Sequence, residues 1–588
     1  MSATKSTHMN FKHTFFAIIV LATLQTARAQ KKDGDIGTEV VNVVKPYTPT
    51  ISDAFKVKET PVLDDEETTK KTNIKYNIFS FPVASTFTPS KGRAASVEKS
   101  AQERLFKNFA TLALGNYGTV NAELFVTENV GENGYVGAML RHLSSQGGIN
   151  GVELNDSFSN SSADLTYGNR QQTYAWNIDG GYQYQGYNWY GLPDDFGFGL
   201  TDDDRQALLN SIEPQHVYHN AYVGGKISFN ESIVNVVSIK YDRFWDTYGA
   251  EENRFIAKPK FHFDINKTQI NTNIIVDYVN GGFDENFNFG LQKYSFLNLG
   301  IQPSFNMVRD DWSINFGATA FYSMDSENSD SKFFIYPNIT ASYKIAGDAM
   351  VFYAGAEGGL QQNSYRDFTN ENPYLSPSIA IAPTDRQFDV YGGLKGKIAN
   401  MVSYNVRGGF TNERDRALFI HNPYSFTVSE PFEYGNSFGV VYDDLRTISV
   451  FGELKADFSK NVSFGIDATF SKYDVAFGKE AWNLPELNAG ASLDVTITPK
   501  WYAGARLFFV SERKDQLMNT DSFETADGIT VTLDSYFDVN AHVGFKYNDR
   551  LTGFLKLNNI ANQSYEKWLN YPVQGIQVML GASYKFDF

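Results

Sequence analysis

From Asn108 to the C-terminus, segments of about 10 to 16 residues alternate between apolar and polar side chains. The final stretch, GIQVMLGASYKFDF, shows the pattern. One set of alternate residues is apolar: Val578, Leu580, Ala582, Tyr584, Phe586 and Phe588. The other set is mostly polar: Gln577, Met579, Gly581, Ser583, Lys585 and Asp587. Because successive side chains of a β-strand point to opposite faces, this period predicts strands with one apolar and one polar face.

The connections between the segments indicate what the apolar face contacts. Ten tight turns can be marked, at ENVGENG, GNRQQ, FNES, NKTQ, RDDW, AGDA, IANM, SKNV, TPKW and YNDR. Longer loops rich in Gly, Asn and Asp lie between them, as at residues 192–214, 361–385 and 415–436. Short turns at one end and long loops at the other are typical of outer-membrane barrels. A soluble β-sandwich or propeller also alternates along its strands, but this turn rhythm disfavours it.

The number of tight turns gives the number of strands. With both chain ends at the short-turn end, ten short turns require eleven hairpins and therefore 22 strands. We predict an all-β fold, a transmembrane antiparallel β-barrel of about 22 strands over residues 105–588. In lipid every backbone polar group must be paired inside the protein, and a closed barrel achieves this without a free edge. The 34 Tyr, 48 Phe and 7 Trp suit aromatic girdles at the membrane interfaces.

Two local features test the strand assignment. Pro259, Pro303 and Pro337 fall inside predicted strands, where each removes a ladder hydrogen bond, so we expect bulges or rim positions there. The stretch TDDDRQALLNSIEP is the best helical pattern and predicts a short loop helix capped by Thr201 or Asp202.

The N-terminal part of the chain differs from the rest. Residues 1–29 contain a basic residue, an apolar run and Ala27-Arg28-Ala29, the pattern of a secretory signal peptide, with an uncleaved anchor as the alternative. Residues 30–104 are rich in Lys, Glu, Thr and Pro and predict an extended periplasmic or lumenal segment of non-globular character. Outside the signal, no stretch approaches the ~18 apolar residues of a membrane helix. We expect export through the inner membrane and location in the cell outer membrane.

The C-terminal 54 residues contain a set of features: Asn558-Asn559 at a strand end, Tyr565, Tyr571, Pro572, Gly575, Phe586 and the terminal Phe588. Together these resemble the end of a TonB-dependent receptor barrel. The family's usual Arg after the Gly is Ile576 here, and ATLALGNYGTVNAELFV resembles the family's first barrel hairpin. The resemblance implies a barrel that is read by the barrel-insertion machinery through its C-terminal strand, embedded in outer-membrane lipid.

The segment before the barrel departs from this family. Its members carry a globular plug domain, and residues 30–104 are too few to hold one. A 22-stranded barrel has a wide lumen, so we expect the N-terminal segment, inward-folded loops or a partner protein to narrow it. The apolar stretch NIFSFPVAST, with Phe79, Phe81 and Pro82, is the candidate to dock on the lumen wall. A disordered linker is the alternative.

A second short stretch resembles the family's TonB box, which adds as a strand to a TonB-type energy transducer in the periplasm. Its residues are Glu39, Val40, Val41, Asn42, Val43 and Val44, followed by Pro46. An ordinary linker piece or an extra strand is the alternative interpretation.

The sequence carries no catalytic motif, so we expect no enzyme, no cofactor and no metal site. His216 and His219 are three residues apart, which places them on opposite faces of a strand. The acidic residues Asp194, Asp195, Asp202, Asp203 and Asp204 lack a calcium-loop spacing and predict a solvated loop. A net charge of −16 disfavours a nucleic-acid partner.

Two functions remain open from the sequence. The first is uptake of an unknown solute, a nutrient or a chelate, across the outer membrane, with displacement of the N-terminal segment and gating by the loops. The second is a non-conducting barrel that acts as the scaffold of a larger outer-membrane complex.

Overall fold

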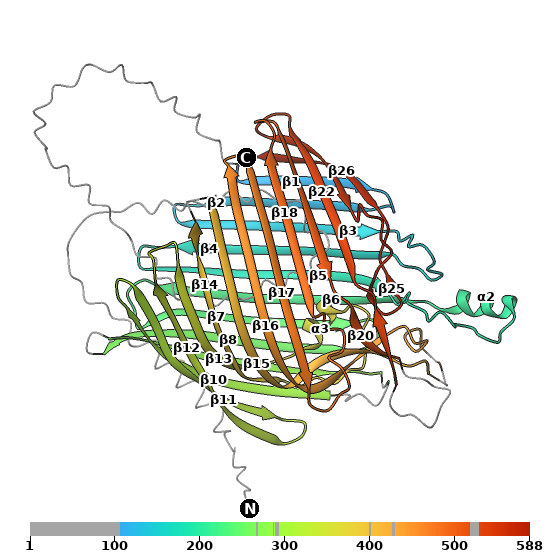
Figure 1. The fold of residues 1–588 in the computed structure, drawn as a ribbon, viewed down its shortest axis with the longest axis horizontal. Helices are drawn as coiled ribbons and strands as arrows, with labels where there is room; N and C mark the ends of the chain where they lie inside the picture. Colours follow the sequence, from blue (N-terminus) through green and yellow to red (C-terminus); the bar gives the residue numbers. More distant parts are fainter. Residues whose placement is uncertain are drawn as a thin grey trace, which may run out of the picture. The chain divides into compact units, whose positions relative to one another are not determined.

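The computed structural model describes residues 106–588 except 266–267, 286, 288–292, 399–400, 426–427, 429 and 518–527. In this part of the chain, 22 strands form one antiparallel sheet (Figure 1). The sheet closes because β1 (Asn108–Gly115) pairs with both β2 (Val120–Val130) and β26 (Gln577–Phe586). The predicted barrel is confirmed. The signal peptide, the segment 30–104, the TonB-box-like residues and Phe79, Phe81 and Pro82 lie outside the described residues.

The wall strands follow one another in sequence order. The others are β3 (Gly134–Ser145), β4 (Phe158–Arg170), β5 (Tyr174–Asn188), β6 (Gln215–Phe229), β7 (Val234–Asp246), β8 (Glu251–Ile265), β9 (Thr268–Gly282), β10 (Lys293–Val308), β11 (Trp312–Asp325), β12 (Asp330–Lys344), β13 (Val351–Gln361), β14 (Thr384–Ile398), β15 (Val402–His421), β16 (Phe438–Ser459), β17 (Val462–Val475), β18 (Leu487–Thr496), β19 (Trp501–Val510), β22 (Tyr536–Lys546) and β23 (Leu551–Asn558). The loops contain α2 (Asp202–Ser211), α3 (Tyr365–Glu371) and two small sheets, β20 (Arg513–Leu517) with β21 (Ile529–Leu533) and β24 (Glu566–Trp568) with β25 (Tyr571–Pro572).

The alternation in the closing strand sorts its side chains between lipid and lumen. Leu580 exposes 68% of its surface on the outside of β26, whereas its neighbour Met579 exposes 1% on the inside. On the inner face, the hydroxyl of Thr111 in β1 donates to the hydroxyl of Ser583 at 3.0 Å. The same sorting along other strands leaves an apolar outer band and a polar lumen wall, as lipid outside and water inside require.

The predicted arrangement of short turns at one end of the barrel and long loops at the other is also confirmed. Each of the ten marked tight turns joins two paired neighbouring strands, and the long loops lie at the other end of the barrel. The predicted loop helix is α2, and its cap is Thr201, whose hydroxyl accepts from the backbone N–H of Asp204 at 3.2 Å. No helix among the described residues is long and apolar enough to cross a bilayer.

The prolines sit inside strands without a bulge at their own positions, contrary to the expectation from sequence. Each instead lies where the ladder to one neighbour is interrupted. Pro259 stays paired with β7 but not β9, and Pro303 stays paired with β9 but not β11. Pro337 stays paired with β11, and the ladder to β13 begins only at the next residue. A proline lacks the backbone N–H that would bond to one neighbouring strand. The strand tolerates this loss because its ladder with the other neighbour continues past the proline.

Several inward-facing glycines accept an aromatic ring that lies flat across the strand. A Cβ added at Gly393 would stand 2.5 Å from Cζ of Tyr353 and 2.6 Å from the carbonyl oxygen of Val406. The Tyr353 hydroxyl reaches over β14 to donate to Oδ1 of Asn405 on β15 at 2.6 Å. The adjacent Gly392 points outward, and the nearest atom to its added Cβ is 3.9 Å away.

Gly393→Ala is therefore expected to destabilise the barrel by about 2 kcal/mol, because overpacking forces Tyr353 off its rotamer or shifts the backbone. The neighbouring Gly392→Ala is the matched control and should change stability by less than about 0.5 kcal/mol. Equilibrium urea unfolding in lipid vesicles measures both variants. Equal effects for the two would contradict the packing role of Gly393.

Candidate functional site at the barrel mouth

The long connections pack against one another at one end of the barrel and form a common buried core. We call it the mouth core. It takes residues from the β5–β6, β13–β14, β15–β16 and β23–β26 connections and from the inner faces of nearby strands. Its most buried members are Tyr218, Phe244, Ala250, Val279, Tyr365, Leu375, Ile379, Ile381, Phe438 and Tyr571. Aromatic and aliphatic groups drawn from loops far apart in sequence are thus removed from water together, which stabilises the loops as a unit.

Three tyrosines from three different connections meet in the mouth core. The ring centroids of Tyr374 and Tyr571 are 3.8 Å apart, and Tyr190 lies 4.7 Å from Tyr571 and 5.6 Å from Tyr374. The Tyr571 hydroxyl donates to the carbonyl of Asn436 at 2.5 Å, and the Tyr190 hydroxyl donates to the carbonyl of Pro572 at 3.0 Å. Burial raises the pKa of all three phenols, so each stays a neutral hydrogen-bond donor.

The β13–β14 connection leaves the wall and crosses the lumen side of the sheet. The side chain of Asn298 on β10 donates to Oε1 of Gln362 at 2.6 Å. Farther along, the backbone N–H of Tyr365 donates to Oε2 of Glu252 on β8 at 2.7 Å. The connection then turns into α3, which is capped by Ser364, whose hydroxyl accepts from the N–H of Asp367 at 3.1 Å.

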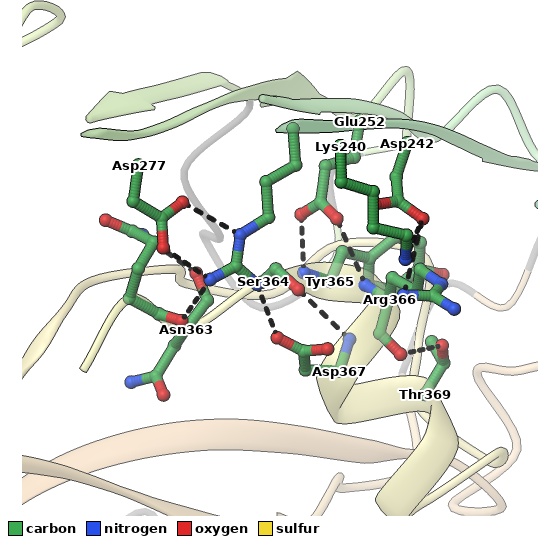
Figure 2. Close-up of polar contacts among 12 residues, drawn as sticks. Lys240, Asp242, Glu252, Asp277, Asn363, Ser364, Tyr365, Arg366, Asp367 and Thr369 are labelled. Atoms are coloured by element: carbon green, nitrogen blue, oxygen red, sulfur yellow. Dashed lines mark hydrogen bonds and ion pairs between the residues drawn. The ribbon is translucent and has the colours of Figure 1, made fainter. Parts of the chain in front are cut away.

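Charged groups fix the start of α3 to the wall, and we call this set of contacts the latch. Arg254 on β8 donates to both carboxylate oxygens of Asp277 on β9, at 2.9 and 2.8 Å. Its remaining terminal nitrogen donates to Oδ2 of Asp367 on α3 at 2.7 Å. Figure 2 shows Asp277 and Glu252 on the wall facing the loop residues from Ser364 to Asp367. One guanidinium therefore holds two strands and the loop helix together.

A second group of the latch is centred on Asp246 at the end of β7. Its Oδ2 lies 2.9 Å from Nε2 of His216 and accepts from the Tyr365 hydroxyl at 2.8 Å. Next to it, Nη1 of Arg366 lies 3.6 Å from Oδ1 of Asp242. Both aspartates and His216 are buried. Buried charges of this kind persist only when they are paired, which links the position of α3 to that of the wall.

The structure places the C-terminal signature residues in three different environments. Tyr571 and Pro572 belong to the mouth core. Tyr565 stacks on Tyr536 with a centroid separation of 4.0 Å and donates to Asp538 at 3.0 Å. Gly575 packs beside the side chain of Asn562. The last two signature residues, Phe586 and Phe588, are at the other end of the barrel, where Phe586 ends β26 and Phe588 is 83% exposed.

The latch residues were not identified from the sequence. Glu252, Arg254 and Asp277 lie in ordinary alternating strands, where nothing distinguishes them from other lumen-facing polar residues. The pattern Ser364-x-x-Asp367 was the available signal, since Ser followed three residues later by an acid marks a helix start. His216 and His219 do lie on opposite faces, as predicted: His216 is buried inside, whereas His219 stacks on Trp245 at 5.2 Å.

The acidic residues considered for calcium have a structural place. Asp202, Asp203 and Asp204 form the first turn of α2, where the helix dipole favours negative charge. Across the described residues, no group of three or more His, Asp or Glu side chains is arranged to hold a metal ion.

Asp515 gives the loops a pH dependence. It lies in the β20–β21 hairpin, outside the membrane-spanning strands, and is fully buried. Its carboxylate accepts from the N–H groups of His421 at 3.0 Å and Gln516 at 2.7 Å. Burial outweighs these bonds and raises its pKa to about 6. In the unfolded chain the pKa is about 3.9, so this acid favours the packed hairpin below about pH 4, and that stability is lost as pH rises through about 6.

We therefore expect the β20–β21 hairpin to be better protected at pH 5 than at pH 7, by an opening free energy of roughly 1–2 kcal/mol. Hydrogen exchange of the Arg513–Leu517 amides, corrected for the intrinsic pH dependence, measures this. Asp515→Asn should remove the difference, whereas Asp534→Asn, which changes an exposed acid nearby, should keep it. A pH dependence that survives in Asp515→Asn would assign the effect to another group.

Comparison with known proteins finds the same fold among solved structures. No protein-family model matches the sequence, and no curated protein matches it. The FrpB iron transporter from Neisseria meningitidis (F3-3 variant) is 12% identical, with 82% of each chain covered and a TM-score of 0.62. The siderophore receptor PirA from Acinetobacter baumannii is 10% identical, with 82% of this chain and 80% of that chain covered and a TM-score of 0.61. The pyoverdine outer membrane receptor FpvA from Pseudomonas aeruginosa PAO1 is 12% identical, covering 83% and 79%, with a TM-score of 0.60.

The chain has the fold of these three proteins. The sequence resemblance to TonB-dependent receptors pointed to the same 22-stranded barrel, which is confirmed. At identities of 10–12% the likeness concerns the fold and not the solute. A closed barrel with an apolar outer face is an integral membrane protein, and barrels of this size belong to outer membranes. The predicted outer-membrane location is confirmed.

Proposed function

We propose that this protein takes up a solute, a nutrient or a chelate, across the outer membrane, in the manner of a TonB-dependent receptor. The observation that carries the proposal is the 22-stranded barrel shared with an iron transporter, a siderophore receptor and a pyoverdine receptor over more than four fifths of the chain. The proposal assigns the chain no catalytic step, no cofactor and no metal of its own.

In this proposal the mouth core is the outer gate. Solute binding outside would weaken the contacts of the β13–β14 connection, and the polar lumen wall would then offer a hydrated path. The stretch Glu39–Val44 would pair with a TonB-type transducer, and the segment containing Phe79, Phe81 and Pro82 would leave the lumen. Ligand-driven opening requires that the solute bind the open loops more tightly than the closed ones.

A scaffold function is the alternative, and one observation favours it. The mouth core is packed like a protein interior: Tyr365, Leu375 and Phe438 are fully buried. Loops packed in this way are stable without any solute. A barrel with a permanently closed mouth would conduct nothing and would serve as a membrane anchor for other outer-membrane proteins.

Planar-bilayer recording separates the two functions. Full-length protein and a variant lacking residues 30–104 are each recorded, and the latch variant Arg254→Ala is recorded in both backgrounds. Uptake predicts current when both the segment and the latch are removed. No current in any of the four forms, together with co-purification of other outer-membrane proteins at fixed stoichiometry, would favour the scaffold.

The energised part of the proposal has its own test. A photocrosslinking residue at Val41 or Val43 should form an adduct with a TonB-type transducer in intact cells. The same residue at Thr50, beyond Pro46, is the matched control and should not. Absence of the Val41 and Val43 adducts would leave passive uptake.

A further inference from the structure

The wall strand β12 has an edge without a ladder partner in its first half, at the loop end of the barrel. On one side β12 pairs with β11 over its whole length, from Asp330 to Tyr343. On the other side its ladder with β13 runs only from Asn338 to Lys344. No backbone bond from another described segment replaces the missing ladder between residues 330 and 337. A free strand edge leaves backbone donors and acceptors unpaired, which closed barrels otherwise avoid.

The edge is apolar where it faces outward. Phe333 and Ile335 expose 64% and 68% of their surfaces, among the most exposed apolar side chains of the wall. The stretch from Lys332 to Tyr336 reads KFFIY, which is rich in residues that favour strands. The edge is therefore well suited to accept another strand.

The ladder with β12 stops where β13 has a bulge between Glu357 and Gly359, and the connection that follows β13 then turns inward. β13 ends at Gln361, and the following residues cross the lumen side to reach Asn298 on β10 and Glu252 on β8. Residues 359–361 stay in the wall beside β14, whereas residues 362–365, which would continue β13 beside β12, lead instead to the latch. The two arrangements exclude each other, because residues 362–365 cannot lie at both places.

The existing register between β12 and β13 defines which residues would pair in the second arrangement. Existing pairs such as Asn338 with Glu357 and Lys344 with Val351 have residue numbers that sum to 695. Continuing the same register upward places residues 358–365 beside residues 337–330, with Ser364 opposite Ser331. Eight further ladder positions, one of them at Pro337 without an N–H to donate, become available when residues 362–365 leave the lumen.

We propose that residues 358–365 are a two-position gate strand. In one position residues 359–361 pair with β14 alone, and residues 362–365 lead to α3, which the latch holds against the wall. In the other position residues 358–365 form a ladder with residues 337–330 at the free edge of β12. This ladder extends β13, moves α3 out of the lumen and pairs backbone groups of β12 that have no ladder partner on that side. The latch sets the balance, since its charged contacts are lost as the ladder pairs form. This switch is a property of the barrel alone and does not require the solute of the proposed function.

A disulfide trap tests the gate strand, and the chain has no cysteine of its own to interfere. Ser331→Cys is combined with Ser364→Cys, and Lys332→Cys with Ser364→Cys covers a register shifted by one residue. In the latched position Ser364 caps a helix held on β8, which is four strand spacings of about 4.8 Å from β12 along the wall, too far for a disulfide.

The expected result is slow disulfide formation in the otherwise unchanged protein and a rise of about tenfold or more when Arg254→Ala is added. Arg407→Ala is the matched control, because Arg407 pairs with Asp389 on the wall at 2.9 Å and is not part of the latch. It should leave the rate unchanged. If Arg254→Ala does not assemble, Glu252→Gln weakens the latch with almost no change in volume.

Two results would overturn the proposal. One is a disulfide yield no higher than that of the single-cysteine proteins in every background. The other is an equal rate with and without the latch. Because the readout is a covalent bond in purified protein, its failure would leave solute uptake untouched, and failure of uptake would leave the gate strand untouched.

Discussion

Replacing Arg254 by alanine is expected to free α3 from the barrel wall. The side chain is 16% exposed and donates to Asp277 and Asp367 together, so its loss leaves two carboxylates without their shared cation. Removing one partner from a largely buried ion pair typically costs about 3 kcal/mol. If that free energy holds the latch closed, the fraction of molecules in which α3 is detached from the wall should rise by about 100-fold.

Hydrogen exchange of the Tyr365–Glu371 amides measures this change directly. Arg407→Ala is the control, since it removes a wall ion pair that has no loop partner in the latch. Arg254→Lys should fall between the two, because an ammonium keeps the charge and loses the bidentate fork. Unchanged exchange in Arg254→Ala would mean that the mouth core alone holds the loop.

Tyr571→Ala is expected to have the largest effect on the mouth core. Its ring is 1% exposed and contacts Tyr374 and Tyr190, and its hydroxyl bonds to the carbonyl of Asn436. Truncating a fully buried aromatic typically costs 3–5 kcal/mol, and here the loss falls on three loops at once. The wall strands keep their ladders, so the barrel should stay folded while the loops loosen.

Limited proteolysis of the intact protein separates these two levels. We expect cleavage in the β13–β14 and β15–β16 connections of Tyr571→Ala while the barrel keeps its heat-modifiable migration. Tyr424→Ala is the control, because Tyr424 lies in the same loop layer and is 40% exposed. If the loops of Tyr571→Ala resist protease as well as those of Tyr424→Ala do, Tyr571 does not stabilise the mouth core.

The wall was largely predictable because its rules are local. A residue such as Leu580 faces lipid and Met579 faces the lumen because they are adjacent in a strand, whatever the rest of the chain does. The tight turns follow from short-range chemistry in the same way, and their number led to 22 strands. The prolines show the limit, since their tolerance depends on which neighbour each strand keeps.

The candidate site was not predictable by such rules. Arg254, Asp277 and Asp367 meet across 113 residues of sequence, and Tyr190 and Tyr571 across 381. Tyr571 was singled out as part of a family motif, but nothing in the motif shows that it anchors loops. The sequence by itself determined a closed sheet with lipid outside and water inside, because the alternation of apolar and polar side chains is set by neighbouring residues along each strand. Only the tertiary structure decided that the mouth is filled by loops and which charges hold them, because these contacts exist only after the barrel brings distant strands to one end.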